Sequence, residues 1–309
     1  MKNVIVTGGT GFIGSWLIQE LLNNFINVVV VARNREKLNV EIRENIRCEI
    51  IEKDIKDLSK DDFEERDYDV FFHLAWEGVS TEKKNNVDIQ LNNVRNAISM
   101  LEICKEIGCK RFIGAGTVAE YVFSEGVMDF DAKQSPNDMY GAAKVAAHYM
   151  LEVRASQLGQ PFIWVVIPST FGERRDDNNI ITYTIVSLLN GKRPVYGKLE
   201  QMWDFLYVGE VVRAMRLVGE RGRDGITYGI GSGVYFPLKK YIIKIRDLIN
   251  PDLPLGIGEL EHMTKQTFSS CVNIDKLKLD TGFSPTVSFE EGMIKTIEYY
   301  KKIQDAGRE

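Results

Sequence analysis

A chain of 309 residues with 44% hydrophobic and 27% charged content is long enough to bury a sizeable core, and it suggests a large domain with a smaller lobe. The net charge of −5 gives no indication of a nucleic-acid partner. We find no apolar stretch near the roughly 20 residues of a membrane span, and the first apolar run is too short for a signal peptide. We therefore expect a cytoplasmic protein with neither a nucleic acid nor a membrane as its partner.

Apolar runs typical of strands recur at 3–7, 26–32, 46–51, 69–74, 110–115 and 161–167, with helical spacing in the longer gaps between them. This alternation predicts an α/β fold of the Rossmann type, a doubly wound parallel sheet with helices on both faces. After Pro168 the elements become shorter and richer in Gly, Pro and aromatic residues. We expect a dinucleotide-binding domain over 1–167, to which 205–220 returns, and a smaller α/β substrate lobe over 168–309.

The first strand runs directly into a glycine-rich turn. Residues 4–7 are followed by Gly8, Gly11 and Gly14, and an amphipathic helix is expected to open at Ser15. Glycines allow a tight turn and close approach of the backbone to a pyrophosphate, while the helix N-terminus offers N–H groups to the phosphates. Because a strand precedes the glycines and a helix follows them, the pattern favours a dinucleotide site over a plain turn.

The residues after the second strand indicate which dinucleotide binds. An NAD site usually has an acidic residue there for the adenosine ribose, whereas this chain reads Ala32-Arg33-Asn34-Arg35-Glu36-Lys37. A guanidinium suits a 2′-phosphate, so Arg33, assisted by Arg35 or Lys37, predicts NADP(H) rather than NAD(H). The alternative is an ordinary solvated run of charge. Asp54, after the third strand, is placed either at the adenine edge or in a surface loop.

Three residues further along form a candidate catalytic set. Tyr140 and Lys144 are four residues apart and therefore share one face of the helix predicted over 140–158. A nearby ammonium favours the phenolate, so we expect the pKa of Tyr140 to be lowered towards a value useful for proton transfer. Thr117 ends the fifth strand, where its hydroxyl is expected to polarise a substrate carbonyl. Alone, the Tyr-x-x-x-Lys spacing is common by chance on helices, and Thr117 could simply cap a helix. The expected fold, however, brings the segments of Thr117 and Tyr140 together at the nicotinamide end of the glycine turn.

Together these motifs resemble the extended short-chain dehydrogenases/reductases that act on nucleotide sugars. Nearly the whole chain takes part, through Thr7-Gly-Gly-Thr-Gly-Phe-Ile-Gly14, His73-Leu-Ala75, Asn93-Val94, Thr117 with Tyr121, Tyr140-x-x-x-Lys144, Phe171-Gly172 and Asp204-Phe-Leu-Tyr-Val208. The resemblance implies that Tyr140 is the general acid/base, that Lys144 also holds the nicotinamide ribose and that Thr117 contacts the sugar. The other expected cofactor contacts are Gly8, Thr10, Gly11, Phe12, Ile13, Arg33, Lys37, Asp54, Ile55, Leu74, Ala75, Asn93 and Pro168.

Departures from the family pattern limit which reactions are expected. Its 4,6-dehydratases carry Thr-Asp-Glu where this chain has Thr117-Val118-Ala119, so dehydration is not expected. The stretch Ala119-Glu120-Tyr121 resembles instead nucleotide-sugar 4-ketoreductases, such as synthases of the CDP-abequose type and dTDP-6-deoxyhexose reductases. A reductase releases its oxidised cofactor at each turnover, whereas a 4-epimerase keeps NAD bound, so Arg33 favours the reductase.

The substrate end is less regular. Trp203 stands where relatives have the arginine that usually holds a diphosphate, which leaves that task to Arg174, Arg175, Lys192 or Arg193. Trp203 either stacks on a base or sugar or belongs to the core, and Trp76 either shapes the pocket or packs beneath its loop. The run 173–179 is either a substrate loop or a solvated turn. The expected substrate contacts are Trp76, Glu120, Tyr121, Ser169, Arg174, Arg175 and Trp203.

We therefore expect NADPH-dependent reduction of the 4-keto group of a nucleotide-linked 6-deoxyhexose, a CDP- or dTDP-sugar, with Tyr140 as general acid. The alternatives are an NAD-dependent nucleotide-sugar 4-epimerase and, from another class, a non-catalytic NADP-binding regulator. The resemblance also implies a homodimer through helices 85–107 and 140–158. Four alanines would allow close approach there or pack within one subunit: Ala142, Ala143, Ala146 and Ala147.

No metal site is expected. The four cysteines lack CxxC spacing, and only three histidines accompany them. We interpret all four as buried thiols: Cys48, Cys104, Cys109 and Cys271.

Overall fold

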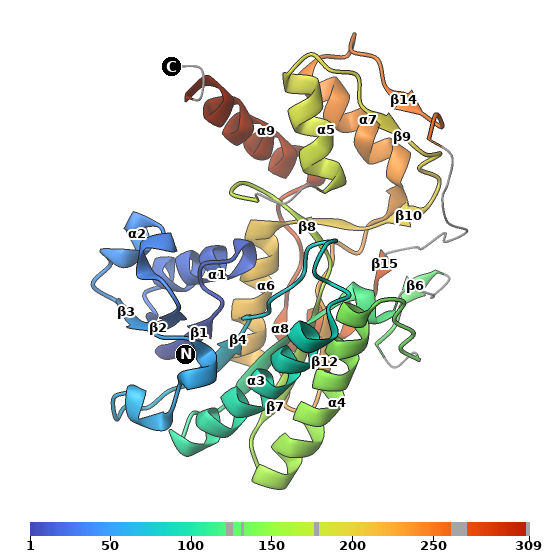
Figure 1. The fold of residues 1–309 in the computed structure, drawn as a ribbon. Helices are drawn as coiled ribbons and strands as arrows, with labels where there is room; N and C mark the ends of the chain where they lie inside the picture. The colour runs from blue at the N-terminus through green and yellow to red at the C-terminus, as the bar shows by residue number, and fades with distance from the viewer. Residues whose placement is uncertain (122–125, 131–132, 176–178, 261–270, 307–309) are drawn as a thin grey trace.

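The central element is a seven-stranded sheet in the order β12-β7-β5-β4-β1-β2-β3 (Figure 1). The computed structural model describes residues 1–121, 126–130, 133–175, 179–260 and 271–306. Every neighbouring pair of strands in this sheet is parallel. Its strands are β1 (Asn3–Thr7), β2 (Asn27–Ala32), β3 (Cys48–Glu52), β4 (Val70–His73), β5 (Phe112–Thr117), β7 (Phe162–Ile167) and β12 (Thr227–Gly229). All the apolar runs predicted as strands lie in this sheet, which confirms the Rossmann-type fold.

Alternate residues of each strand pack on opposite faces of the sheet. Val4 and Val6 pack with α1 (Phe12–Asn23) and α6 (Val208–Arg221). Ile5, between them, packs with α3 (Val87–Glu106) and α4 (Met139–Leu158) on the other face. Because both faces are covered, the strands are almost continuously apolar. The two long helices predicted after the fourth and fifth strands are α3 and α4, which lie side by side in Figure 1.

A smaller group of helices, α5 (Ile180–Leu189), α7 (Leu238–Ile249) and α9 (Phe289–Ala306), lies at the top of Figure 1. They share an apolar core that includes Phe205, Tyr241 and Phe289. Short strands pair around them: β8 (Ser169–Phe171) with β11 (Phe205–Tyr207), β10 (Met202–Trp203) with β13 (Phe236–Pro237), β9 (Val195–Tyr196) with β14 (Gly256–Ile257), and β6 (Val127–Met128) with β15 (Cys271–Val272). The remaining helices are α2 (Val40–Arg43), α8 (Asp275–Thr281) and the 3₁₀ turns η1 (Arg35–Lys37), η2 (Ile55–Asp57), η3 (Lys60–Asp62) and η4 (Val118–Tyr121).

Within the expected range 205–220, helix α6 lies against the main sheet, whereas the strand before it does not. At the start of that range β11 pairs with β8, outside the seven-stranded sheet. Helix α6 then packs on α1, and β12 joins the sheet beside β7. Helix α8 lies against both α6 and β12, so a segment near the C-terminus also belongs to this face.

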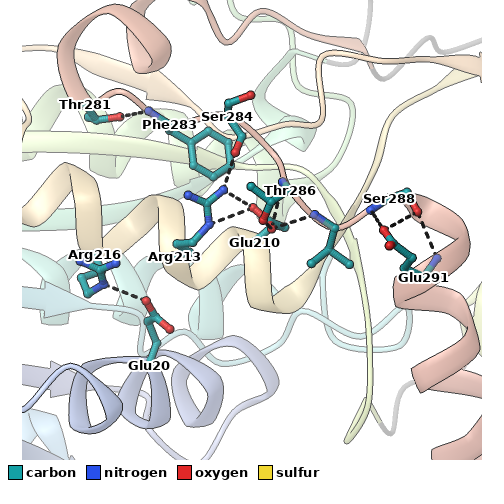
Figure 2. A network of polar contacts seen from close by, with 11 residues as sticks. Glu20, Glu210, Arg213, Arg216, Thr281, Phe283, Ser284, Thr286, Ser288 and Glu291 are labelled. Atoms are coloured by element: carbon teal, nitrogen blue, oxygen red, sulfur yellow. Dashed lines mark hydrogen bonds and ion pairs between the residues drawn. The ribbon is translucent and has the colours of Figure 1, made fainter.

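Polar contacts centred on α6 tie these parts together (Figure 2). The buried carboxylate of Glu210 pairs with Arg213 and accepts hydrogen bonds from the backbone N–H groups of Thr286 at 3.1 Å and Val287 at 3.0 Å. On the opposite side, α6 is joined to α1 by an ion pair of 2.7 Å between Arg216 and Glu20. The chain segment that leads into α9 is therefore anchored to a helix of the main sheet.

None of the helices in the described ranges is long and apolar enough to cross a membrane. All four cysteines are free thiols. Three of them are buried as expected, whereas Cys48 is half-buried because β3 is the edge strand of the sheet. Within the described residues, no group of three or more His, Cys, Asp and Glu side chains is arranged to hold a metal ion.

Candidate active site

The glycine turn between β1 and α1 forms the floor of the site. Gly8 has a φ of +77°, and a Cβ there would lie 2.7 Å from the backbone of Leu74 and Ala75. A Cβ at Gly14 would lie 2.2 Å from the Gly8 carbonyl oxygen. Helix α1 begins at Phe12, earlier than the expected Ser15, and its N-cap residue, Gly11, makes no side-chain hydrogen bond to the first turn. The N–H groups of that first turn are therefore available to a phosphate, as the sequence pattern predicts.

A cavity of about 490 Å³ lies between this turn and the carboxyl ends of β2 and β3. We call it the adenosine cavity. The expected cofactor residues on its wall are Gly8, Thr10, Gly11, Arg33, Asp54, Ile55, Leu74, Ala75 and Asn93. Lys37 is not among them, because it lies exposed in η1. Sequence reasoning missed Lys53, Lys56, Glu77, Asn92 and Asn96. Asn92 adjoins Asn93, and Asn96 lies about one helical turn further along α3. The helical spacing of these asparagines was therefore the sequence signal that could have identified them.

Opposite charges face each other in the adenosine cavity. Nη1 of Arg33 lies 3.9 Å from Oε2 of Glu77, and both side chains are more than half exposed. The amide of Asn93 holds the loop after β4 in place, since it accepts from the Glu77 N–H at 3.0 Å and donates to the Glu77 carbonyl at 2.8 Å. Asp54 caps η2 by accepting from the Lys56 N–H at 3.1 Å. The cavity thus offers a guanidinium to a phosphate and a carboxylate to ribose hydroxyls.

A second cavity of about 610 Å³ continues from the first, sharing Gly8, Gly11, Leu74 and Trp76 with it. We call it the catalytic cavity. The expected residues on its wall are Phe12, Ile13, Trp76, Thr117, Tyr140, Lys144, Pro168, Ser169, Arg175 and Trp203. The wall also includes Asn179 from the run 173–179 and residues that sequence reasoning missed, among them Val79, Val118, Thr170 and Phe205. In the run 173–179, the structure describes Glu173 to Arg175 and Asn179. Residues 176–178 lie outside the described residues.

The candidate catalytic residues meet in this cavity. Tyr140 and Lys144 lie in the first turns of α4, whose N-cap Asp138 accepts from the Gly141 N–H at 2.8 Å. Thr117, at the end of β5, is hydrogen-bonded to the Tyr140 hydroxyl. The Lys144 ammonium donates to the Ala115 carbonyl at 2.6 Å. Two segments far apart in the chain therefore converge on one point.

The expected lowering of the Tyr140 pKa is wrong for this structure. Burial raises the pKa of Tyr140 to about 12, with further increases from Glu120 and Asp138 that the hydrogen bond from Thr117 opposes. Burial also lowers the pKa of Lys144 to about 7, against the opposing effect of Glu120. The loss of water around the phenol outweighs the neighbouring ammonium, because that ammonium is bonded to Ala115 instead of the phenol.

Several expected substrate contacts do not reach the cleft. Glu120 and Tyr121 are buried at 0% and 2% exposure, and the Glu120 carboxylate accepts from the Thr117 N–H instead of facing the cavity. Arg174 has a φ of +68°, and its side chain turns away towards Trp16 and Glu41. These three residues therefore do not line the catalytic cavity.

Four expected substrate contacts line the catalytic cavity: Trp76, Ser169, Arg175 and Trp203. Arg175 lies on the cavity wall, donates to the Thr170 carbonyl and sits 5.5 Å from the Phe12 ring centroid. Trp76 lines both cavities, so it shapes the pocket. Trp203 lines the catalytic cavity, and its buried indole N–H has no hydrogen-bond partner in the described part of the chain.

Comparison with known proteins gives a family match over residues 4–231 and individual relatives that cover nearly the whole chain. Residues 4–231 match the model of the NAD dependent epimerase/dehydratase family. The chain is 29% identical to a dTDP-glucose 4,6-dehydratase of Escherichia coli, over 96% of this chain and 93% of that protein. Its fold is similar to UDP-N-acetylglucosamine 4-epimerase from Methanobrevibacter ruminantium, with a TM-score of 0.87 and 25% identity over 98% of this chain and 99% of that one. It is also similar to MoeE5 in complex with UDP-glucuronic acid and NAD, with a TM-score of 0.85 and 25% identity over 97% and 99% of the two chains.

Proposed function

This chain belongs to the NAD dependent epimerase/dehydratase family, and from that premise we propose that it is an NADPH-dependent reductase of the 4-keto group of a nucleotide-linked 6-deoxyhexose. It has the extended short-chain dehydrogenase fold of nucleotide-sugar enzymes. Relatives named for dTDP-glucose and UDP-sugars support a nucleotide sugar as the substrate. The choice of a CDP- or dTDP-sugar rests on the resemblance of Ala119-Glu120-Tyr121 to nucleotide-sugar 4-ketoreductases, because Glu120 and Tyr121 themselves do not line the catalytic cavity.

The observation that carries this proposal is the composition of the catalytic cavity. Among the described residues on its wall, none is Asp or Glu. Elimination of water from the sugar needs an acid and a base beside the catalytic threonine, and Val118 stands there instead. Thr117, Tyr140 and Lys144 remain, and they are sufficient for hydride transfer to a carbonyl. A purely regulatory binding protein would have no use for this set.

Each residue has a defined task in the reduction. NADPH supplies the hydride when it is bound between the glycine turn and α4. The free N–H groups at the start of α1 would hold its pyrophosphate, and Lys144 its nicotinamide ribose. Thr117 polarises the sugar carbonyl. Tyr140, whose raised pKa keeps its proton on the phenol, then gives that proton to the alkoxide, and the Lys144 ammonium stabilises the phenolate left behind.

Arg33 supports NADPH as the cofactor. It follows Ala32 at the end of β2, where no acidic residue stands, and it lines the adenosine cavity. A 2′-phosphate would replace the weak contact with Glu77 by paired, charge-assisted hydrogen bonds.

One observation favours the second candidate, an epimerase with tightly bound NAD. The Glu77 carboxylate lines the adenosine cavity and is placed to accept from ribose hydroxyls. Such an epimerase would be purified with its dinucleotide and would consume no NADPH. The content of bound dinucleotide in the purified protein therefore separates the two candidates.

The proposal is tested by turnover. The purified protein is mixed with NADPH and each of the CDP-, dTDP-, UDP- and GDP-linked 4-keto-6-deoxy sugars, and loss of the reduced cofactor is followed by absorbance. We expect oxidation with one CDP- or dTDP-sugar, and none with the Tyr140→Phe variant. No oxidation with any sugar, together with NAD in the purified protein, would favour the epimerase.

We further propose a homodimer formed by α3 and α4. Exposed apolar side chains follow helical spacing on both helices: Val87 and Leu91 on α3, and Tyr149, Met150 and Val153 on α4. Ala143 and Ala147 are buried in the subunit's own core and Ala142 is half-buried, whereas Ala146 is exposed. Sedimentation is expected to show a dimer that Val153→Glu dissociates, and a monomeric wild-type protein would contradict this.

A further inference from the structure

Glu120 is a fully buried carboxylate next to the catalytic threonine, and the reaction described above does not use it. Its side chain is 0% exposed. Oε1 accepts a hydrogen bond from the backbone N–H of Thr117 at 2.8 Å. Both carboxylate oxygens lie 3.3 Å from the indole nitrogen of Trp164. Burial of a carboxylate is unfavourable unless hydrogen-bond donors compensate it, so a fully buried glutamate at this position indicates a structural or functional role.

The neighbouring strand leaves room for this carboxylate. Gly116 precedes Thr117 in β5, and a Cβ at Gly116 would lie 2.5 Å from Oε1 of Glu120 and 2.3 Å from Nε1 of Trp164. A side chain at this position would displace the carboxylate from the Thr117 N–H. The absence of a side chain at Gly116 thus keeps Glu120 in contact with the end of β5.

The titratable groups that face Glu120 come from α4. Nδ1 of His148 lies 3.8 Å from Oε2, and burial lowers the pKa of this imidazole to about 4, so it is neutral at pH 7. Gln134 donates a neutral hydrogen bond to Oε2 at 3.3 Å. Tyr140 is likewise uncharged at this pH, because its pKa is raised. Burial raises the pKa of Glu120 to about 7, so its carboxylate is mostly charged only above this pH. Among the described residues, the cation on this side is Lys144, whose Nζ lies 6.0 Å from the centroid of the same Trp164 ring, and the charged forms of the two residues favour each other.

We propose that Glu120 is a positioning residue: its carboxylate holds the end of β5 so that the Thr117 hydroxyl meets Tyr140, and in its charged form it favours the ammonium of Lys144. The proposal rests on the proposed function in so far as Thr117, Tyr140 and Lys144 are catalytic. Glu120 itself touches neither substrate nor cofactor, so it acts through these residues.

The first test measures Lys144 directly and needs no turnover. The full-length protein is treated with cyanate over a range of pH, and carbamylation of Lys144, which requires the neutral amine, is followed by peptide mass spectrometry. In Glu120→Gln the midpoint for Lys144 is expected to fall by about one pH unit, because an uncharged amide no longer favours the ammonium. Glu120→Asp retains the charge, so its midpoint should lie close to the wild-type value. An unchanged midpoint in Glu120→Gln would overturn the proposal.

The second test uses turnover with the sugar that supports NADPH oxidation. Glu120→Gln should lower kcat roughly fivefold at pH 7, because a fall of about one unit in the pKa of Lys144 leaves about a tenth instead of half of it protonated. The alkaline limb of the pH profile should move to lower pH, with both KM values changed less than about twofold. The control is Glu210→Gln, which removes another buried carboxylate, drawn in Figure 2 and remote from both cavities. It should lower the unfolding temperature without moving the pH profile. If the wild type has no reductase activity but the Lys144 midpoint shifts, the proposed function fails and the charge coupling stands.

Discussion

The Lys144 ammonium lies 3.7 Å from the centroid of the Trp76 ring. The indole is held in this place by a hydrogen bond of 2.9 Å from its N–H to Gln90 of α3. A cation over an aromatic face gains about 0.5–2 kcal/mol, depending on how far it is removed from water. The loop after β4 therefore contributes directly to the environment of the catalytic lysine on α4.

The lowered pKa of Lys144 predicts the pH dependence of the reduction. The ammonium stabilises the phenolate that Tyr140 leaves, so activity requires the protonated amine. Because the pKa of Lys144 is about 7, kcat should fall as the pH rises through this value. The pH profile of NADPH oxidation measures this, with Lys144→Gln as the variant that should be slow and lack the alkaline limb. A wild-type kcat that stays constant well above pH 7 would disagree with this role.

Tyr140→Phe should lower kcat by about 10²–10⁴-fold, the usual contribution of a general acid. Thr117→Val should also be slow, because it removes the hydroxyl that is bonded to Tyr140, and Thr117→Ser should recover most of the rate. NADPH affinity, measured by fluorescence titration, should be nearly unchanged in Thr117→Val. Wild-type turnover by Tyr140→Phe would exclude Tyr140 as the acid.

Arg33→Ala should weaken NADPH binding and leave NADH binding unchanged. Charge-assisted hydrogen bonds contribute about 1.5–3 kcal/mol, so the Kd for NADPH should rise by roughly ten- to a hundredfold. Lys37→Ala is the matched control, since Lys37 carries the same charge but lies outside the adenosine cavity. Equal losses for NADPH and NADH in Arg33→Ala would mean that Arg33 is a surface charge without a role in cofactor choice.

Trp203→Phe should raise the KM for the sugar nucleotide without lowering the unfolding temperature. The variant keeps an aromatic ring but removes an N–H that has no partner in the described part of the chain. A buried donor without a partner costs about 1–3 kcal/mol, so its removal should leave stability equal or improved. If KM is unchanged while stability falls, Trp203 serves as a core residue alone.

The sequence predicts the fold well because its signals are local. Strand runs and helical spacing locate the main sheet and its helices, and the glycine turn needs only its own neighbours. By contrast, β12 has three residues, which is too short for a periodic pattern.

The site is less predictable from the sequence where it depends on the direction and burial of individual side chains. Glu120 and Val118 lie in one 3₁₀ turn, yet Val118 lines the cavity while Glu120 turns into the core, and residue order does not distinguish the two. Arg174 and Arg175 are a second example: Arg174 has a positive φ and its side chain points away from the cavity, whereas Arg175 lies on the cavity wall. The pKa of Tyr140 follows from loss of water in the folded chain, which the Tyr-x-x-x-Lys spacing does not report.

The most direct test of 4-ketoreduction is to follow the hydride itself. NADPH carrying deuterium at the transferred position of its nicotinamide is supplied with the 4-keto sugar nucleotide, and the product is analysed by mass spectrometry and NMR. We expect one deuterium at C4 of the sugar for each NADPH oxidised. A 4-keto sugar that gains no deuterium while NADPH is not consumed would contradict 4-ketoreduction, and inversion at C4 of a 4-hydroxy nucleotide sugar without NADPH consumption would identify the protein as an epimerase.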